Sequence, residues 1–158
     1  MPQEASIMHP GTPPFEYNQI TNHIYIGTNQ CCTTHFEQEL LDKGVTADIS
    51  LEAERIDNPE GVDYFVWLPT KDHTPPTMNQ LYIGVENIKK FVDLGIKVYV
   101  HCKNGHGRAP TLVAAYFISE GKDVDAAIEA IRAKRSAIHL EDSQIERLRE
   151  YRKELIGE

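Results

Sequence analysis

The stretch VHCKNGHGRAPT (residues 100–111) decides how this chain folds and what its central loop can bind. It begins within KVYVHC (97–102), a nearly continuous apolar run that is typical of a buried central strand. It ends in a segment that we expect to be a helix over residues 109–120. The residues between the strand and the helix read C-x-x-G-x-G-R, so a cysteine, two glycines and an arginine occupy one strand-to-helix turn.

Such a turn points free backbone N–H groups and the positive end of a helix dipole at one place, which binds phosphate readily. Gly105 and Gly107 allow the backbone to curl around an oxyanion, and the planar fork of Arg108 can hold two phosphate oxygens. The same cradle favours the thiolate form of Cys102, which would then face a bound phosphorus atom. The loop therefore indicates nucleophilic catalysis, although a phosphate-binding loop without chemistry remains an alternative.

Cleavage of a phosphoester also requires an acid that protonates the leaving oxygen. Asp72 is the best candidate, because it lies in the irregular segment TKDHTPPT (70–77), whose adjacent prolines exclude regular structure. A loop after a strand end can close over a site. The alternative is that Asp72 only caps a turn. His73, beside it, either tunes the acid or faces solvent.

The remaining pattern alternates strands and helices along the chain. Strands are expected at 24–28, 45–51, 63–69 (stopped by Pro69) and 97–102, and helices at 34–44 (ending at Gly44), 78–95, 109–120, 123–137 and 141–155. This order predicts an α/β fold, a central and mostly parallel sheet with helices on both faces. Residues 1–14 are rich in proline and small residues and are expected to be a flexible tail, followed by one domain over residues 15–158.

Composition narrows the classes of partner. The net charge is −8, and the first 80 residues carry three basic and twelve acidic side chains against thirteen and twelve in the remainder. An acidic chain is poorly suited to nucleic acid or to stable association with anionic membrane, so an anion site must be local. The sequence has neither a run of about 18 apolar residues nor the pattern of a signal peptide. We expect a cytoplasmic protein without a cofactor.

Three cysteines do not make a disulfide framework. Cys31 and Cys32 are adjacent and are expected to be ordinary buried residues, and whether either is redox-coupled to Cys102 stays open. Together with His35 they read C-C-x-x-H, which fits no usual zinc spacing. We therefore predict no metal site there.

These residues resemble a known family. HCKNGHGR is similar to the H-C-x5-R signature of cysteine-dependent protein phosphatases, and DHTPP resembles their mobile acid loop. The order and spacing of strand, acid loop, helix, signature and terminal helices resemble the small dual-specificity phosphatases over roughly residues 15–155. The resemblance implies a phosphatase domain of that fold, which acts through a phosphocysteine intermediate.

The resemblance also assigns roles. Cys102 would be the nucleophile, Arg108 the phosphate clamp, and Asp72 the acid of the first step and the base of the second. His101 would support the loop from behind. Gln144 either orients water, as a glutamine does in some members, or is a solvated helix residue. The backbone N–H groups of the loop would hold the phosphoryl oxygens; its residues are Lys103, Asn104, Gly105, His106, Gly107 and Arg108.

One position departs from most of the family, which has Ser or Thr directly after the arginine, where this chain has Ala109. That hydroxyl helps the thiolate to leave when the phosphocysteine is hydrolysed, so its loss should slow the second step. Arg108-Ala109-Pro110 resembles the phosphatase of regenerating liver subgroup, which turns over weakly.

Substrate clues are few, and the oligomeric state is open. We expect the partner to be a phosphoprotein, through phosphotyrosine or phosphoserine/threonine. Lys103 and His106 add positive charge within the loop, at positions where lipid-directed members often carry lysine, so an inositol phosphate or phosphoinositide is the alternative. A catalytically weak phosphate-binding module and a small redox or sulfur-transfer enzyme are the remaining alternatives.

Overall fold

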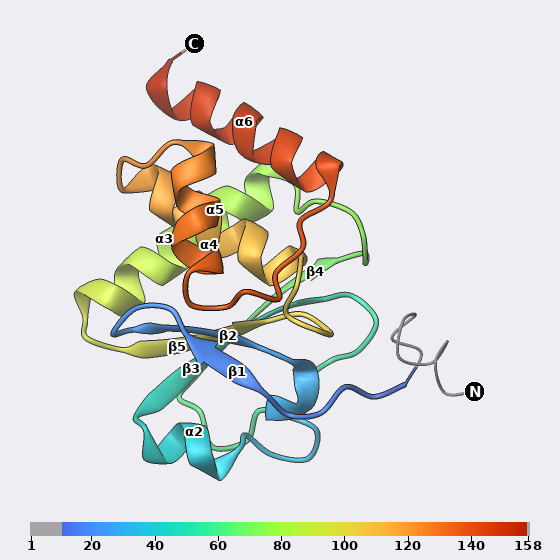
Figure 1. Cartoon of the computed structure of the whole chain (residues 1–158). Helices are drawn as coiled ribbons and strands as arrows, with labels where there is room; N and C mark the ends of the chain where they lie inside the picture. Colours follow the sequence, from blue (N-terminus) through green and yellow to red (C-terminus); the bar gives the residue numbers. More distant parts are fainter. Residues whose placement is uncertain (1–10, 158) are drawn as a thin grey trace.

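The central strand of the sheet is β5 (Lys97–His101), as its apolar sequence predicts. The computed structural model describes residues 11–157, and in it five strands form one sheet in the order β1-β2-β5-β3-β4 (Figure 1). The other four strands are β1 (Tyr17–Gln19), β2 (Ile24–Gly27), β3 (Val45–Glu52) and β4 (Tyr64–Thr70). β2, β5, β3 and β4 pair in parallel, and β1 pairs antiparallel with β2, so the predicted mostly parallel sheet is confirmed.

Helices cover both faces, but unequally (Figure 1). One face carries four helices: α3 (Met78–Asp93), α4 (Arg108–Ser119), α5 (Val124–Arg132) and α6 (Asp142–Ile156). The other face carries the short helix α2 (Gln38–Asp42) and a 3-10 turn, η1 (Asn29–Cys31). Each face has its own apolar cluster, and the smaller one gathers Tyr25, Phe36, Leu40 and Tyr99 with Cys31 and Cys32. The predicted α/β architecture is confirmed.

The helix predicted over residues 34–44 is shorter at its start. The backbone N–H of Phe36 donates to the Glu60 carbonyl at 2.9 Å and that of Glu37 to the Cys31 carbonyl at 2.7 Å. These partners hold the segment outside a helix until residue 38. Gly44 follows the helix with a φ of 88°, the conformation that glycine adopts most easily after a helix end.

Two further boundaries differ from the prediction, and one strand was not predicted. β4 continues through Pro69, because this strand lies at the edge of the sheet and the proline is exposed, where a missing N–H donor does no harm. α5 ends at Arg132 rather than at residue 137, and the Lys134 N–H then bonds to the Ile131 carbonyl in the tighter i→i−3 pattern that is common at helix ends. β1 was not predicted, since its three residues show no alternation of apolar and polar types.

The predicted tail lies mostly outside the described residues, which begin at residue 11. Residues 11–16 have no regular structure, and the Thr28 hydroxyl donates to the Pro14 carbonyl at 2.8 Å. The division into tail and single domain stays a prediction. Within residues 11–157, no helix combines the length and the apolar character that a membrane crossing requires.

α4 is the innermost helix, and it contacts α3, α5, α6 and the sheet. Nearly all its side chains are buried. It meets α3 tightly at Gly84, where a Cβ atom would lie 2.5 Å from Leu112 Cδ1 and 3.1 Å from Leu68 Cδ1. The glycine therefore sets the distance between the two helices, and with it the position at which α4 begins beside the loop.

Replacing Gly84 by alanine should destabilise the fold by up to about 2 kcal/mol, because the added methyl overpacks this contact at a cost of about 1–3 kcal/mol. The intrinsic helix preference has the opposite sign and favours alanine by about 1 kcal/mol, so urea denaturation distinguishes the two effects. Gly11→Ala is the matched control, since nothing lies within 4 Å of that position. Stabilisation by Gly84→Ala would show that α3 and α4 can separate without cost.

Candidate active site

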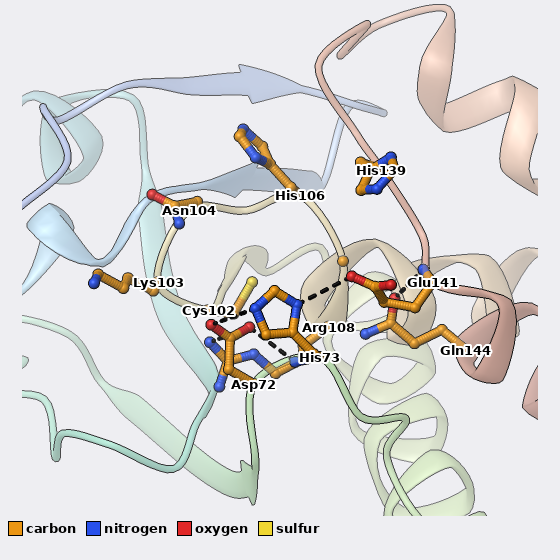
Figure 2. A pocket seen from close by; sticks show the side chains of 11 residues that line it. Asp72, His73, Cys102, Lys103, Asn104, His106, Arg108, His139, Glu141 and Gln144 are labelled. Carbon is orange, nitrogen blue, oxygen red and sulfur yellow. Dashed lines mark hydrogen bonds and ion pairs between the residues drawn. The ribbon is translucent and has the colours of Figure 1, made fainter. Parts of the chain in front are cut away.

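The loop between β5 and α4 forms the floor of a pocket at the carboxyl edge of the parallel strands (Figure 2). The pocket has a volume of about 380 Å³. It is lined by Asp72, His73, Cys102, Lys103, Asn104, His106, Gly107, Arg108, His139, Glu141 and Gln144. The structure thus brings the predicted nucleophile, arginine, acid and loop residues together, whereas Gly105, His101 and Ala109 lie behind the lining.

The carbonyl groups of the loop are bound from outside. The Asn29 N–H donates to the Lys103 carbonyl at 3.1 Å, and the His139 N–H donates to the His106 carbonyl at 2.6 Å. In a trans peptide the C=O and the following N–H point in opposite directions. Carbonyls that are held outward therefore turn the next N–H groups toward the pocket, where they can hold phosphoryl oxygens.

Arg135 supplies the other half of this support. Its Nε donates to the Gly105 carbonyl and its Nη2 to the Asn104 carbonyl, both at 2.9 Å. The guanidinium is only 1% exposed, and it is fixed by Glu16, at 2.7 and 2.9 Å, and by Asn18, at 2.9 Å. A buried arginine from beyond α5 thus ties the loop to the start of the chain.

Gly105 is required twice by this arrangement. Its φ is 72°, which side chains rarely adopt. A Cβ atom there would lie 2.6 Å from the Gly27 carbonyl oxygen and 2.8 Å from Arg135 Nη2. A positive φ at Gly105 is what a curl of the backbone requires, whereas Gly107 has a φ of −129°, and the curl presses the loop against β2.

Cys102 is a free cysteine and is 3% exposed at the floor of the pocket. Arg108 stands beside it, 2% exposed, and its Nη1 donates to Glu54 Oε1 at 2.8 Å and to the Thr70 carbonyl at 2.7 Å. Its Nη2 lies 3.4 Å from Asp72 Oδ1. The buried Nε has no hydrogen-bond partner among residues 11–157, which leaves one donor for a phosphate oxygen.

The charge of Arg108 is secured by its neighbours. Burial alone would lower the pKa of this guanidinium, but the negative charge of Cys102 and the carboxylates of Glu54 and Asp72 raise it above its ordinary value. A cation that stays charged in a buried position has its full attraction for an anion. Glu54 was not foreseen from the sequence.

Asp72 lies over the pocket, and its side chain is 46% exposed. Its Oδ1 accepts from the His73 N–H at 3.0 Å, and its own N–H donates to Glu54 Oε2 at 3.2 Å. His73 has a φ of 65°, the one non-glycine residue among those described with a positive φ. Its Nδ1 lies 3.0 Å from Glu141 Oε2, so the ring bridges the acid loop and the start of α6 (Figure 2).

Gln144 is not a solvated helix residue, which was one of its two predicted roles. It is 1% exposed, and its Nε2 donates to the Thr74 carbonyl at 3.1 Å. Its Oε1 accepts from the Glu141 N–H at 2.8 Å, and a Cβ at Gly107 would lie 3.0 Å from that oxygen. Gln144 therefore joins α6, the acid loop and the catalytic loop, while its role toward water stays a prediction.

His101 is fully buried behind the loop, as expected of a supporting residue. Its Nδ1 lies 3.3 Å from the Cys102 carbonyl, and its Nε2 lies 2.7 Å from Asp57 Oδ2 and 3.2 Å from Asp48 Oδ1. Burial alone would lower the pKa of His101, but the two carboxylates raise it well above its ordinary value. Burial also raises the pKa of Asp48 to about 7. Burial opposes the ionisation of Asp57 too, but His101 holds the pKa of that carboxyl below its ordinary value.

Cys31 and Cys32 are both fully buried, as predicted, but they are joined by a disulfide, which was not. This bond closes no long loop, since the two residues are adjacent, and it does not act as a framework. Cys102 is not part of it. The Nδ1 atom of His35 lies 2.8 Å from the Phe36 carbonyl oxygen, so the ring contacts the backbone next to it.

Comparison with known proteins identifies the domain. Residues 24–154 match the family model described as the catalytic domain of dual specificity phosphatases. The Rattus norvegicus protein named phosphatidylglycerophosphatase and protein-tyrosine phosphatase 1 is 46% identical over 90 residues, which are 56% of this chain and 47% of that protein. Phosphatidylglycerophosphate phosphatase PTPMT2 of Arabidopsis thaliana is 38% identical over 79 residues, 49% of this chain and 35% of that protein. The chain spans about half the length of the rat protein.

Solved structures agree. The crystal structure of PTPMT1 matches with a TM-score of 0.76 and 33% identity, over 90% of this chain and 97% of that chain. A structure of PTPMT1 in complex with PI(5)P matches with a TM-score of 0.75 and 31% identity, over 89% and 97%. Human DUSP28 matches with a TM-score of 0.81 over 91% and 97%, and its 18% identity supports the fold alone.

Replacing Arg135 by methionine should lower kcat/KM for p-nitrophenyl phosphate about 10²-fold, because the loop N–H groups lose their orientation and small displacements at a reacting centre are costly. Arg132→Met is the matched control, one turn earlier on α5 and partly exposed beside Glu129; it should change kcat/KM less than about twofold. Melting curves separate misfolding from misplacement. An unchanged kcat/KM in a folded Arg135→Met protein would mean that the loop holds its shape unaided.

Proposed function

This chain belongs to the dual specificity phosphatase family, and from that premise we propose that it is a cysteine-dependent phosphomonoesterase for the phosphorylated headgroup of an anionic phospholipid. The observation that carries the choice of substrate is the similarity to PTPMT1, 33% identical over 90% of this chain, for which a complex with PI(5)P is known. The names of the curated relatives point the same way, since two of them include phosphatidylglycerophosphate or its phosphatase activity.

The reaction has two steps. In the first, the Cys102 thiolate attacks phosphorus, a P–S bond forms, the P–O bond of the ester breaks, and Asp72 gives its proton to the leaving oxygen. In the second, Asp72 takes a proton from a water that attacks the phosphocysteine, and the thiolate leaves as inorganic phosphate forms. The loop N–H groups and Arg108 hold the three phosphoryl oxygens in both steps.

The acid matters more for a lipid than for an aryl phosphate. The leaving group of a glycerol or inositol phosphate is an alkoxide, which is too basic to leave without a proton. Asp72 lies 3.4 Å from Arg108 Nη2, on the side of the pocket where His73 and Glu141 hold its loop to α6. This position over the thiol suits an acid that must reach a leaving oxygen.

The pocket also suits a substrate with more than one negative charge. Lys103, His106 and His139 line it together with Arg108, although the chain as a whole carries −8. The sequence favoured a phosphoprotein, with a phosphoinositide as the alternative, and the relatives support the alternative better. A headgroup phosphate can reach this pocket during brief encounters with a membrane, so the proposal does not need stable membrane association. The expectation of a cytoplasmic protein is retained as part of the proposal.

Mixing the enzyme with excess p-nitrophenyl phosphate should give a burst of about one nitrophenol per enzyme, followed by slow turnover. We expect the slow phase because Ala109 lacks the hydroxyl that would help the thiolate to leave. Cys102→Ser should abolish both phases. Ala109→Ser should speed the slow phase and leave the burst unchanged. Steady release of nitrophenol without a burst would show that hydrolysis of the intermediate is not limiting. If no nitrophenol were released, the enzyme proposal would be rejected in favour of a phosphate-binding module.

The substrate class is tested with phosphatidylglycerophosphate and PI(5)P in detergent micelles, alongside phosphotyrosine and phosphothreonine peptides. We expect kcat/KM for one of the lipids to exceed that for either peptide at least about tenfold. Asp72→Asn should lower kcat about 10²–10⁴-fold for the lipid, and less for p-nitrophenyl phosphate, whose leaving group needs little help. Preference for the phosphopeptides would restore the phosphoprotein reading and reject the lipid one.

A further inference from the structure

We propose that Asp48, Asp57, His101 and the thiolate of Cys32 form a zinc-binding site buried beneath the catalytic loop. The four residues come from β3, from the segment that follows it, from the end of β5 and from the turn after η1. Each of the four residues has one nitrogen, oxygen or sulfur atom that could bind a metal, and these atoms lie within 4.8 Å of one another. The sulfur of Cys31 belongs to the same group of atoms. Thiolate, imidazole and carboxylate are the ligands that zinc takes in proteins.

The burial of the cluster is the observation that favours a bound cation. Asp48, His101 and Cys32 are 0% exposed and Asp57 is 7% exposed, so two carboxylates lie away from water. Neither oxygen of Asp48 accepts a hydrogen bond from any residue within 11–157, although its Oδ1 is in ion-pair contact with His101. The other cation nearby, Arg55, lies 3.7 Å from Asp57 Oδ1 and is itself 31% exposed. Buried charge without full compensation is costly, and a divalent metal supplies that compensation.

Three of the distances between ligand atoms are close to those around a tetrahedral metal. Zinc–ligand bonds of about 2.0–2.3 Å at tetrahedral angles place neighbouring ligand atoms about 3.3–3.6 Å apart. Cys32 Sγ lies 3.6 Å from His101 Nε2 and 3.2 Å from Asp57 Oδ2, and Asp48 Oδ1 lies 3.2 Å from the same nitrogen. The 2.7 Å between Asp57 Oδ2 and Nε2 must lengthen by about 0.6 Å.

The second nitrogen of His101 already has the partner that a metal-bound histidine uses. Its Nδ1 lies 3.3 Å from the Cys102 carbonyl, and a ligating imidazole commonly donates its other N–H to a backbone carbonyl. A metal on Nε2 fixes the N–H on Nδ1 and thus the orientation of the nucleophile's own peptide group. The site would act on the catalytic loop through His101, without contact with substrate.

The disulfide between Cys31 and Cys32 makes the site dependent on redox state. Two molecules of a small thiol reduce it, supplying two electrons and two protons, and become a disulfide themselves. The Cys32 thiol and the His101 imidazolium then release one proton each to solvent as the metal binds, and Asp48 releases its proton as well in the chains where it carries one. In the disulfide, Cys32 Sγ lies 3.2 Å from Asp57 Oδ2 without a proton to donate, so only the reduced thiol can form a hydrogen bond there.

The test uses a pair of matched variants, Cys31→Ser and Cys32→Ser, in a Cys102→Ser background that removes the catalytic thiol as a competing ligand. Each full-length protein is exposed to zinc alone, washed with a weak chelator, and analysed for metal by elemental analysis and native mass spectrometry, with and without a thiol reductant. Neither variant can form the disulfide, and each differs from its parent by one atom, so both should fold.

We expect Cys31→Ser to retain about one zinc per chain under both conditions, and the Cys102→Ser parent to retain it only after reduction. Cys32→Ser and Asp48→Asn should retain none. Zinc should raise the melting temperature of Cys31→Ser and leave that of Cys32→Ser unchanged. Equal metal content in the two serine variants, or none in Cys31→Ser, would overturn the proposal. Because metal content is read without turnover, this outcome is independent of the proposed phosphatase activity.

Discussion

The outward pull on the carbonyl groups of the catalytic loop is the interaction on which the site depends. The carbonyls of residues 103–106 accept hydrogen bonds from Asn29, Arg135 and His139, which lie in three distant segments. A loop left to itself would turn carbonyl oxygens as readily as N–H groups toward the pocket. Preorganised donors stabilise an oxyanion because no reorganisation is paid during the reaction. Arg135 is the strongest of these supports, since its charge is buried and shared with Glu16.

On the open side of the pocket, one arginine also serves two parts of the site. Arg108 is held by Glu54 and lies near Asp72, so the phosphate clamp and the acid loop share one cation. A bound phosphate would compete with the carboxylates for this guanidinium. Gln144 and Glu141 hold the acid loop from α6 through Thr74 and His73, so Asp72 does not depend on Arg108 alone for its position.

Features that depend on residues close together in the sequence were predictable, whereas features that depend on distant residues were not. The strand, the two glycines and the arginine lie within one short stretch, so the sequence predicted the sheet centre, the turn and the pocket residues of the loop, but not His139 and Glu141, which line the pocket from a distant segment. Arg135 lies 30 residues along the chain from the Gly105 carbonyl that it holds. Its neighbours in the sequence do not distinguish this buried arginine from basic residues that lie on the surface. The burial of Gln144 depends on where α6 packs, and the late start of α2 on carbonyls of Cys31 and Glu60. Long-range partners of this kind leave no local pattern.

Two buried carboxylates lie behind the catalytic loop, on the side away from the pocket. The thiolate of Cys102 must carry its charge only one residue from His101, which is flanked by Asp48 and Asp57. Two ionised carboxylates in a dry interior would oppose that thiolate. His101 offsets one of them and Arg55, 3.7 Å from Asp57 Oδ1, offsets part of the other, so a proton on Asp48 or a bound cation would neutralise the remainder. Either way, the charge of this buried cluster bears on the loop that holds Cys102 through His101, which lies outside the lining of the pocket.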